Sequence, residues 1–551
     1  MENEPPRHRV HRGDLMMKRP GAVALIASPV VLVGVVMLVA FLFRLRGVTW
    51  GLPYLYDPDE HVLVDPAVRF VTTGDLNPHW FGYPGSTIMY PLGLAYLVYW
   101  IIGYLVGWFP DLQSFATLFW ANPTSFYLIA RIMTIVLATL AIPLTYALCR
   151  KMAGIGTSLA AAIFVAVSPL HADFSRVVRT DPVMTTFVLA AMFCAVKAME
   201  EESDKEFFLS GIFVGLATAT KWTGVCAAVT TLLAIAFASP EPAESKARRW
   251  RWSSLAALGG IIGFLGAAPF VFTGVRQVYW GLVAEGTGSH LSGNGSPGLS
   301  NWVWYITVPL RDAVGAPLEL AALVGLVASL GARRRPRMLL AVFSILFVVG
   351  IGLGHKRWDR WIVPLMPCVA ILAAIGLQTL AQAVHWWKER PRVRECVVVA
   401  LGVLLVMPSA MEAFQRGGTI LDTRDIGKSW IDGHVPPGSR VAVEQYAPPI
   451  SRDTYQVFFV VEGSPSLQRD TTTRGFKGVL ADMKTLAPLR GAGVDYVVTT
   501  NWPDRYRAEA TEYPDEVRYY DELFAASDLL YEVDPTERTK GPVIRILKFR
   551  H

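Results

Sequence analysis

Long apolar runs recur along most of this chain, and they limit what it can fold into. Runs such as 23–43, 124–148 and 182–199 approach the roughly 20 residues that a helix needs to cross the hydrocarbon core of a bilayer. The composition agrees, because 52% of the residues are hydrophobic and only 17% are charged, against about 25% charged in soluble domains. The sequence therefore predicts a protein with many membrane-spanning helices.

Basic residues indicate where the predicted segments turn back. Residues 1–20 are rich in Lys and Arg, which predicts a cytoplasmic start. Later basic stretches recur at alternate turns and fit about eleven crossings. The predicted crossings are 23–43, 124–148, 154–170, 182–199, 207–237 as two short helices, 253–273, 314–331, 338–353, 362–380 and 397–414. This alternation predicts a multi-pass protein of the plasma (inner) membrane whose C-terminal region lies outside the cytoplasm.

The apolar run 83–108 breaks this alternation. A crossing there would place the later basic stretches on the outer side. We therefore expect it to be an interfacial or re-entrant helix that begins and ends outside. Residues 61–70 alternate apolar and polar side chains at helical spacing, which also suits an interfacial helix.

The composition changes near residue 415, where charge rises and apolar runs shorten. Short buried strands are predicted at 439–445, 494–500 and 542–548, with helix-like stretches before each. The expected fold is an all-α polytopic membrane protein with a small C-terminal α/β domain outside the cytoplasm. Its expected parts are a cytoplasmic basic N-terminus, a transmembrane domain and the α/β domain, at residues 1–20, 21–414 and 415–551.

The charge and the cysteines argue against some functions. Basic residues beside membrane segments carry much of the net charge of +6, so the charge reflects topology rather than nucleic-acid binding. The five cysteines lie in or at the ends of apolar runs without the spacing of a zinc site, and we interpret them as small core residues.

An acidic stretch follows the first apolar run. Asp57, Asp59 and Glu60 lie beside His61 on the predicted outer side. Carboxylates held at a membrane face are candidates for acid–base chemistry or for a metal site. The alternative is a solvated loop in which Pro58 and the Asp residues only form turns and cap a helix.

The other predicted outer loops supply cations and a further carboxylate. Their charged residues and histidines are His171, Arg176, Arg179, Asp181, His290, Lys356, Arg357 and Arg360. A reaction that expels a phosphate needs a base for the acceptor hydroxyl and cations for the charge that develops on the phosphate. Arginine suits the second task because its planar fork matches phosphate oxygens. Asp181 precedes Pro182, so helix capping alone is an alternative role for it.

Lys221 interrupts the apolar stretch 207–237. A lysine at that depth is costly unless an anionic group or a cavity meets it. We therefore predict two short helices that meet in the membrane at Lys221. The alternative is one tilted helix whose lysine side chain extends to the membrane surface.

Together these features resemble a known family, the GT-C glycosyltransferases. The similar motifs are Asp59-Glu60 after the first membrane helix, Arg179-Thr180-Asp181-Pro182, the run Gly-Leu-Ala-Thr-Ala-Thr-Lys-Trp-Thr-Gly at 215–224, and Arg360-Trp361-Ile362-Val363-Pro364. The nearest branch is family 39, with the protein mannosyltransferases and the bacterial aminoarabinose transferases of lipid A. The resemblance covers about residues 20–380, and Trp361 stands where Tyr is more usual.

The resemblance implies a function and a set of roles. Enzymes of this branch transfer a sugar with inversion from a polyprenyl-phosphate donor, on the extracytoplasmic side, to a lipid, protein or glycan acceptor. By position, Asp59 is expected to be the general base, Glu60 to assist it, and Asp181 to orient the acceptor or a metal. The expected substrate-binding residues are Asp57, Arg179, Lys221, His290, Arg357 and Arg360. No cofactor is assigned, and the need for a divalent cation stays open.

Two rival functions are compatible with a polytopic membrane protein. A transporter or flippase for a lipid-linked sugar would place polar residues along several helices and show an internal two-fold repeat. No clear repeat is present, and the polar residues gather on one predicted face. A ligand-binding or assembly protein would act through 415–551, where no catalytic motif occurs.

Overall fold

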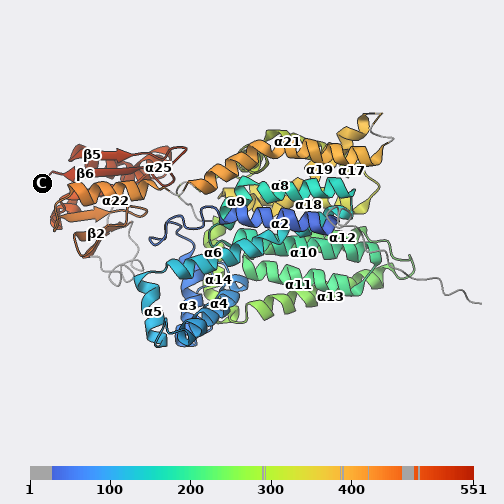
Figure 1. Ribbon diagram of the computed structural model, residues 1–551, viewed down its shortest axis with the longest axis horizontal. Coiled ribbons are helices and arrows are strands. Elements are labelled where there is room, and N and C mark those ends of the chain that lie inside the picture. The colour runs from blue at the N-terminus through green and yellow to red at the C-terminus, as the bar shows by residue number, and fades with distance from the viewer. Residues whose placement is uncertain are drawn as a thin grey trace, which may run out of the picture.

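A computed structural model describes residues 28–287, 291, 293–384, 386, 390–419, 421–461, 477–481 and 484–550. These residues form a long bundle of helices with a small sheet domain at one end (Figure 1). The predictions for residues 1–20 and for His290 lie outside the described residues.

The helices of the bundle mostly run side by side along its long axis (Figure 1). Each predicted crossing coincides with one helix or with two consecutive helices, where η denotes a 3₁₀ or π turn. These helices are α2 (Pro29–Leu45), α6 (Thr124–Thr139) with α7 (Ala141–Arg150), α8 (Ile155–Val167), α10 (Thr180–Glu201), α11 (Asp204–Thr220), η1 (Trp222–Cys226) with α12 (Ala227–Phe237), α13 (Ser245–Ala267), α17 (Ala316–Leu330), α18 (Arg335–Gly352), η4 (Asp359–Leu365) with α19 (Met366–Ala383), and α21 (Pro391–Gly418). Shorter connecting helices are α9 (Pro169–Ser175), η2 (Val271–Gly274), α14 (Val275–Thr287), α15 (Leu299–Tyr305), η3 (Ile306–Leu310) and α16 (Arg311–Val314).

The number of spans differs from the number expected. Among the described residues, six helices are long and apolar enough to cross a membrane, and up to nine spans result if each bent pair of helices counts as one. Two segments of the bundle, Pro29–Leu45 and Trp222–Phe237, are apolar but too short to meet this criterion. The prediction of a helical membrane protein is confirmed, whereas the count of about eleven crossings is not.

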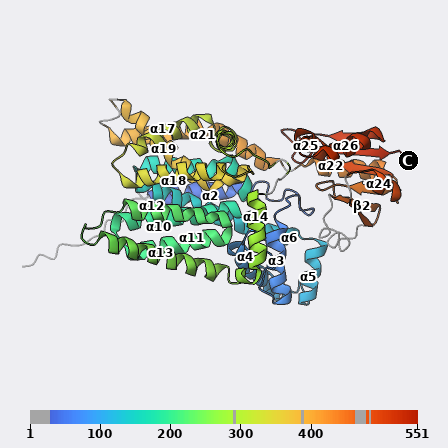
Figure 2. The ribbon, with the colours of Figure 1, turned by 180° about the vertical axis from the view of Figure 1, so that it is seen from behind.

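The run predicted to be interfacial forms α4 (Ser86–Leu105), which is one of the six helices long enough to cross. It lies beside α3 (His61–Thr73) at the end of the bundle nearest the sheet domain (Figures 1 and 2). The rings of Phe70 and Tyr90 stack across the two helices, with centroids 5.2 Å apart. Both α3 and α5 (Leu112–Ala121) run across the direction of the bundle. Whether α4 spans the membrane or lies at its surface stays a prediction.

The helices α11 and α13 pack with their backbones in contact. A Cβ atom added at Gly211 would lie 2.0 Å from the carbonyl oxygen of Ala256, and one at Gly215 would lie 2.3 Å from that of Gly260. Only glycine allows such an approach, as at other helix interfaces within membranes. This contact fixes the position of α11, and Lys221 lies at the C-terminal end of that helix.

The C-terminal domain is a six-stranded sheet with helices, in the strand order β3-β2-β1-β4-β6-β5. Its strands are β1 (Arg440–Val443), β2 (Gln456–Val461), β3 (Gly478–Ala481), β4 (Tyr496–Thr499), β5 (Ser527–Val533) and β6 (Ile544–Phe549), and its helices are α22 (Thr423–His434), α24 (Ala487–Gly491), α25 (Trp502–Ala508) and α26 (Pro514–Ala525). The strands β1 to β4 are parallel, and β6 is antiparallel to both β4 and β5. The three predicted strands correspond to β1, β4 and β6. The described residues contain β2, β3 and β5 in addition.

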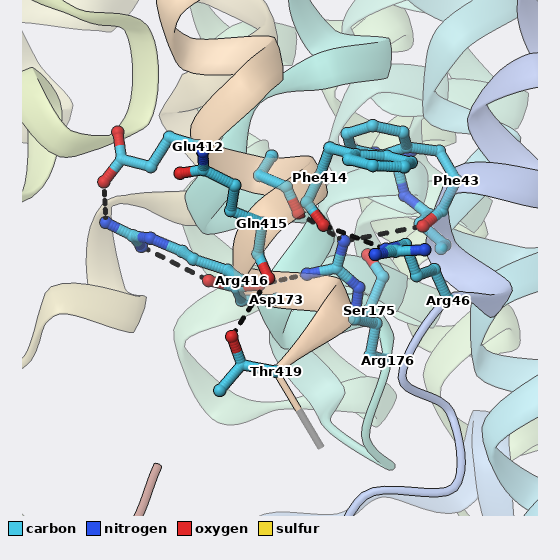
Figure 3. A network of polar contacts seen from close by, with 12 residues as sticks. Phe43, Arg46, Asp173, Ser175, Arg176, Glu412, Phe414, Gln415, Arg416 and Thr419 are labelled. Atoms are coloured by element: carbon cyan, nitrogen blue, oxygen red, sulfur yellow. Dashed lines mark hydrogen bonds and ion pairs between the residues drawn. The ribbon is translucent and has the colours of Figure 1, made fainter. Parts of the chain in front are cut away.

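A polar network fixes the end of α21, from which the chain enters the sheet domain (Figure 3). Arg416 in the last turn of α21 contacts Asp173 of α9 at 3.2 Å and Glu412 at 2.5 Å, and it also pairs with Asp312 of α16. Arg176 pairs with Asp173 and donates to the carbonyl oxygen of Ala413 at 2.9 Å. Two elements that are far apart in the sequence, α9 and α16, thus hold the end of α21.

Candidate active site

Arg179 joins the two aspartates of the acidic stretch. Its Nη2 and Nε donate to Asp57 Oδ2 at 2.8 and 3.3 Å, and its Nη1 pairs with Asp59 Oδ2. The backbone N–H of Asp59 donates to Asp57 Oδ1 at 2.9 Å, so a tight turn presents both side chains to the same cation. Burial lowers the pKa of Arg179, but the two carboxylates outweigh burial and raise it overall. Arg179 thus stays positively charged and holds Asp57 and Asp59 together.

Arg360, at the start of η4, reaches the same oxygen of Asp59 at 3.5 Å. Both side chains are partly accessible, with exposed fractions of 25% for Arg360 and 32% for Asp59, whereas Asp57 is 9% exposed. Within the described part of the chain, Asp59 Oδ1 accepts no hydrogen bond. Asp59 is therefore the carboxylate of this group that can still accept a proton from an incoming molecule.

Lys221 pairs with Asp181 at 2.7 Å, and both side chains are largely buried. The backbone at Lys221 is extended and separates α11 from η1, so the interrupted stretch consists of two helices that meet there, as predicted. The lysine meets an anionic partner instead of extending to a surface. The carboxylate of Asp181 is directed to Lys221, and the N-cap of α10, Arg179, has no side-chain capping bond.

The two ion pairs adjoin each other. Lys221 lies within electrostatic range of both Arg179 and Arg360. Tyr83 lies within range of Asp59 and of Asp181, and burial raises the pKa of its hydroxyl above the ordinary value. The structure thus brings together residues from five separate segments, and Tyr83 is a member that the sequence did not indicate.

Glu60 differs from its neighbours because it is fully buried. Arg131 of α6 donates to its two oxygens at 2.7 and 2.6 Å, and the backbone N–H of Val178 donates to it at 2.9 Å. The remaining nitrogen of Arg131 donates to the carbonyl oxygens of Val48 and Trp50 at 2.6 and 2.8 Å. Burial raises the pKa of Glu60, and the bonds and charge of Arg131 oppose that shift. Glu60 therefore fastens the acidic stretch to α6 and to the turn before Arg179.

One of the expected binding residues, Arg357, is not joined to this cluster. The guanidinium of Arg357 lies 5.0 Å from the ring centroid of Trp304, and within the described residues it pairs with neither Asp57 nor Asp59. His290 lies outside the described residues. The part of the chain that the structure describes has no group of three or more His, Cys, Asp or Glu placed to hold a metal ion. Since Asp57 and Asp59 are engaged by Arg179, this donor set does not fit a divalent cation.

Comparisons with known proteins agree with this architecture. A family model described as dolichyl-phosphate-mannose-protein mannosyltransferase matches residues 103–272. The structure of ArnT from Cupriavidus metallidurans in the apo state is similar, with a TM-score of 0.52, 15% sequence identity and coverage of 94% of this chain and 97% of that chain. The archaeal oligosaccharyltransferase AglB from Archaeoglobus fulgidus, in complex with an inhibitory peptide and a dolichol-phosphate, has a TM-score of 0.54, 12% identity and coverage of 93% and 74%. No curated protein sequence matches the chain significantly. At these identities, the likeness to ArnT and AglB shows a common fold.

Proposed function

We propose that this chain, which has the GT-C glycosyltransferase fold and resembles the protein mannosyltransferases and aminoarabinose transferases, transfers a sugar from a polyprenyl-phosphate donor to an acceptor. The similar AglB structure contains a dolichol-phosphate, which supports a lipid phosphate as the carrier. The observation that carries the proposal is the meeting of Asp59, Arg360, Lys221 and Asp181 at one end of the bundle.

The cations of the cluster provide a place for the donor phosphate. Arg360 is partly exposed, its contact with Asp59 is long at 3.5 Å, and its guanidinium lies 5.0 Å from the ring centroid of Trp358, so its side chain can turn to an arriving phosphate at little cost. Lys221 adds a second positive charge beside it. Both charges stabilise the phosphate as it leaves the sugar. Arg179 is held by two carboxylates and keeps Asp59 in place instead.

Asp59 is the base in this mechanism. The acceptor hydroxyl donates its proton to Asp59 Oδ1 while its oxygen forms a bond to the anomeric carbon. The bond from that carbon to the phosphate oxygen breaks, and polyprenyl phosphate leaves with the electron pair. A single displacement of this kind inverts the configuration at the anomeric carbon. Glu60 and Asp57 take positioning roles, and Asp181 orients Lys221.

We propose that the reaction takes place on the extracytoplasmic side. The acidic stretch lies at the end of the bundle that carries the sheet domain, because Tyr56 donates to Asp425 of α22 at 2.5 Å and accepts from Arg424 at 3.1 Å. The positive-inside pattern of the sequence assigns that end to the outer face of the membrane. A lipid-linked donor in the outer leaflet would reach the site from the bilayer.

The test is to incubate the purified full-length protein with a panel of radiolabelled polyprenyl-phosphate sugars and to measure transfer and release of the sugar. We expect at least one donor to be consumed. Asp59→Asn should lower the rate by about 10²- to 10⁴-fold, the usual contribution of a general base, with an unchanged midpoint of thermal unfolding.

A matched control is Asp75→Asn, because Asp75 is exposed and pairs with His79 in the loop after α3. Full activity of Asp59→Asn would refute the assigned base. Movement of intact donor across vesicle membranes without any sugar release would favour the transporter alternative.

A further inference from the structure

The carboxyl ends of β1 and β4 lie where the strand order of the sheet reverses. From β1 the chain proceeds through β2 to the edge strand β3, and it then returns to β4 on the other side of β1. In open α/β sheets, ligands bind outside the carboxyl ends of the strands at such a point. The helix that follows β4, α25, lies on the side of the sheet domain that faces the helical bundle (Figures 1 and 2). The usual ligand position of this kind of sheet therefore faces the candidate active site.

Glu444 holds the two strand ends together. It follows β1, is 3% exposed, and accepts hydrogen bonds from Thr499 Oγ1 at 2.8 Å and from the N–H of Thr500 at 3.0 Å. The hydroxyl of Tyr520 donates to its other oxygen at 2.8 Å. The carbonyl oxygen of Gln445 accepts a further bond from the indole of Trp502 at 3.3 Å. The backbone on both sides of this point is thus fixed before any ligand arrives.

Tyr446 occupies this point in a conformation that is rare for its side chain. Its φ is 68°, in the left-handed region that favours glycine. Such strain persists only where the surrounding structure imposes it, and it is concentrated at functional sites. The ring of Tyr446 lies nearly parallel to that of Trp502, with centroids 6.1 Å apart at 12°. The guanidinium of Arg505 lies 5.4 Å from the ring centroid of Trp502.

This aromatic pair faces the acidic stretch. Tyr446 lies within electrostatic range of Asp59, Asp57 and Arg179. The sheet domain also holds the residue before Asp57, because Tyr56 donates its hydroxyl to Asp425 of α22 at 2.5 Å. The hydrogen bond from Tyr56 to Asp425, and one from Arg424 to the carbonyl oxygen of Tyr56 at 3.1 Å, thus hold the sheet domain against the residues that carry the chemistry.

We infer that Tyr446, Trp502 and Arg505 form the acceptor subsite of the enzyme, and that the acceptor is a glycan bearing an anionic group such as a phosphate. Flat aromatic faces take the ring of a sugar, as in other sites built from aromatic walls and a few polar groups. In the described part of the chain, Arg505 forms no ion pair with a carboxylate. Its guanidinium instead donates to the Asn501 amide oxygen, at 3.1 and 3.2 Å when that amide is turned to accept. The cation is therefore available for an anion.

A peptide acceptor fits this surface less well. Extended peptides usually add as a further strand at the edge of a sheet. Here the edges are β3 and β5, whereas the surface lies at the carboxyl ends of the central strands β1 and β4. A bound glycan would lie between Trp502 and Asp59, with one hydroxyl directed to the base.

This inference rests on the proposed function, but its test has a readout that needs no turnover. Equilibrium binding to the full-length protein in detergent is measured with a phosphorylated disaccharide, the same disaccharide without phosphate, and a serine-containing peptide. Transfer from the active donor to each of the three is measured in parallel. Arg505→Gln should weaken binding of the phosphorylated disaccharide about tenfold and raise its KM similarly, because a charge-assisted hydrogen bond is lost. Binding of the neutral disaccharide and the KM for the donor should not change.

Two further variants separate a binding role from a structural one. Tyr446→Gly removes the ring but relieves the left-handed backbone, so the sheet domain should be no less stable while acceptor binding weakens about tenfold. Arg507→Gln is the matched control, because Arg507 lies on the same helix and pairs with the exposed Asp521 at 2.8 Å. Unchanged glycan binding in Arg505→Gln and Tyr446→Gly, or preferential binding of the peptide, would overturn the inference. If no donor is consumed but these binding losses occur, the proposed function fails and the glycan site stands.

Discussion

Glu60 and Arg131 form a fully buried, bidentate ion pair that joins the acidic stretch to α6, with both contacts at 2.6–2.7 Å. Removing one partner leaves the other as an uncompensated buried charge, which costs about 3–5 kcal/mol. Arg131→Met should therefore lower the midpoint of thermal unfolding strongly and reduce the yield of folded protein. The double variant Glu60→Gln with Arg131→Met should recover part of that loss. If Arg131→Met left the midpoint of thermal unfolding unchanged, the ion pair would not be what holds the acidic stretch in place.

Arg360 and Arg357 allow a matched test of donor binding. Arg360 contacts Asp59, whereas Arg357 stacks on Trp304 away from the carboxylates. Arg360→Gln should raise the KM for a polyprenyl-phosphate sugar about ten- to hundredfold, the loss expected for a charge-assisted hydrogen bond. Arg357→Gln should change it little. Equal effects of the two variants, measured by initial rates over a range of donor concentrations, would mean that the contact with Asp59 does not identify the phosphate-binding arginine.

The ion pair of Lys221 and Asp181 has a structural role and a functional role, and variants can separate the two. Lys221→Met leaves the Asp181 carboxylate buried without its partner and should destabilise the fold by about 3–5 kcal/mol. Combining it with Asp181→Asn removes the unpaired charge and should restore the unfolding midpoint. Transfer activity should stay low in the double variant, because the charge that faces the leaving phosphate is still missing. Recovery of activity together with stability would assign the pair a purely structural role.

The sheet domain should respond to pH through Glu444. Burial raises the pKa of this carboxyl from its ordinary 4.5 to about 7. Because the folded state holds the proton more tightly, the contribution of Glu444 to stability is fully present below about pH 4.5 and is lost as the pH rises through about 7. Hydrogen exchange of β1 and β4, corrected for the intrinsic effect of pH, should show weaker protection at pH 8 than at pH 5.5. In Glu444→Gln this difference should shrink, while Asp515→Asn, at an exposed pair with Arg518, should keep it.

The helices were predictable because the apolar runs were long, and three of the strands were predictable because their residues are mainly apolar. β1, β4 and β6 lie in the middle of the sheet or next to it and consist mainly of apolar residues. Most residues of β5 are exposed, including the apolar Leu529 and Leu530. Its sequence therefore lacks the alternation of apolar and polar residues that predicts a strand. The number of spans differs from the prediction because Pro29–Leu45 and Trp222–Phe237 are apolar but too short to meet the length needed for a crossing.

The sequence predicted which charged residues gather at one face of the membrane, but it did not predict which of them form ion pairs with one another. Asp59, Asp181, Lys221 and Arg360 were indicated by their segments, and the structure brings them together. That Glu60 is bound by Arg131 depends on how α6 packs, which no local pattern encodes. Tyr83 and Tyr446 come from loops in different halves of the chain, and a tyrosine in a loop has no signal that distinguishes it from the aromatic residues common at membrane surfaces.

The contact between α11 and α13 makes the reactivity of the site depend on two residues without any chemistry of their own. A single methyl group at Gly215 would force the two backbones apart, because its Cβ would lie 2.3 Å from the carbonyl oxygen of Gly260. Since α11 ends at Lys221, the displacement would move the ammonium group relative to Asp181 without altering any charge. A substitution remote from every substrate atom would then slow the enzyme through alignment alone.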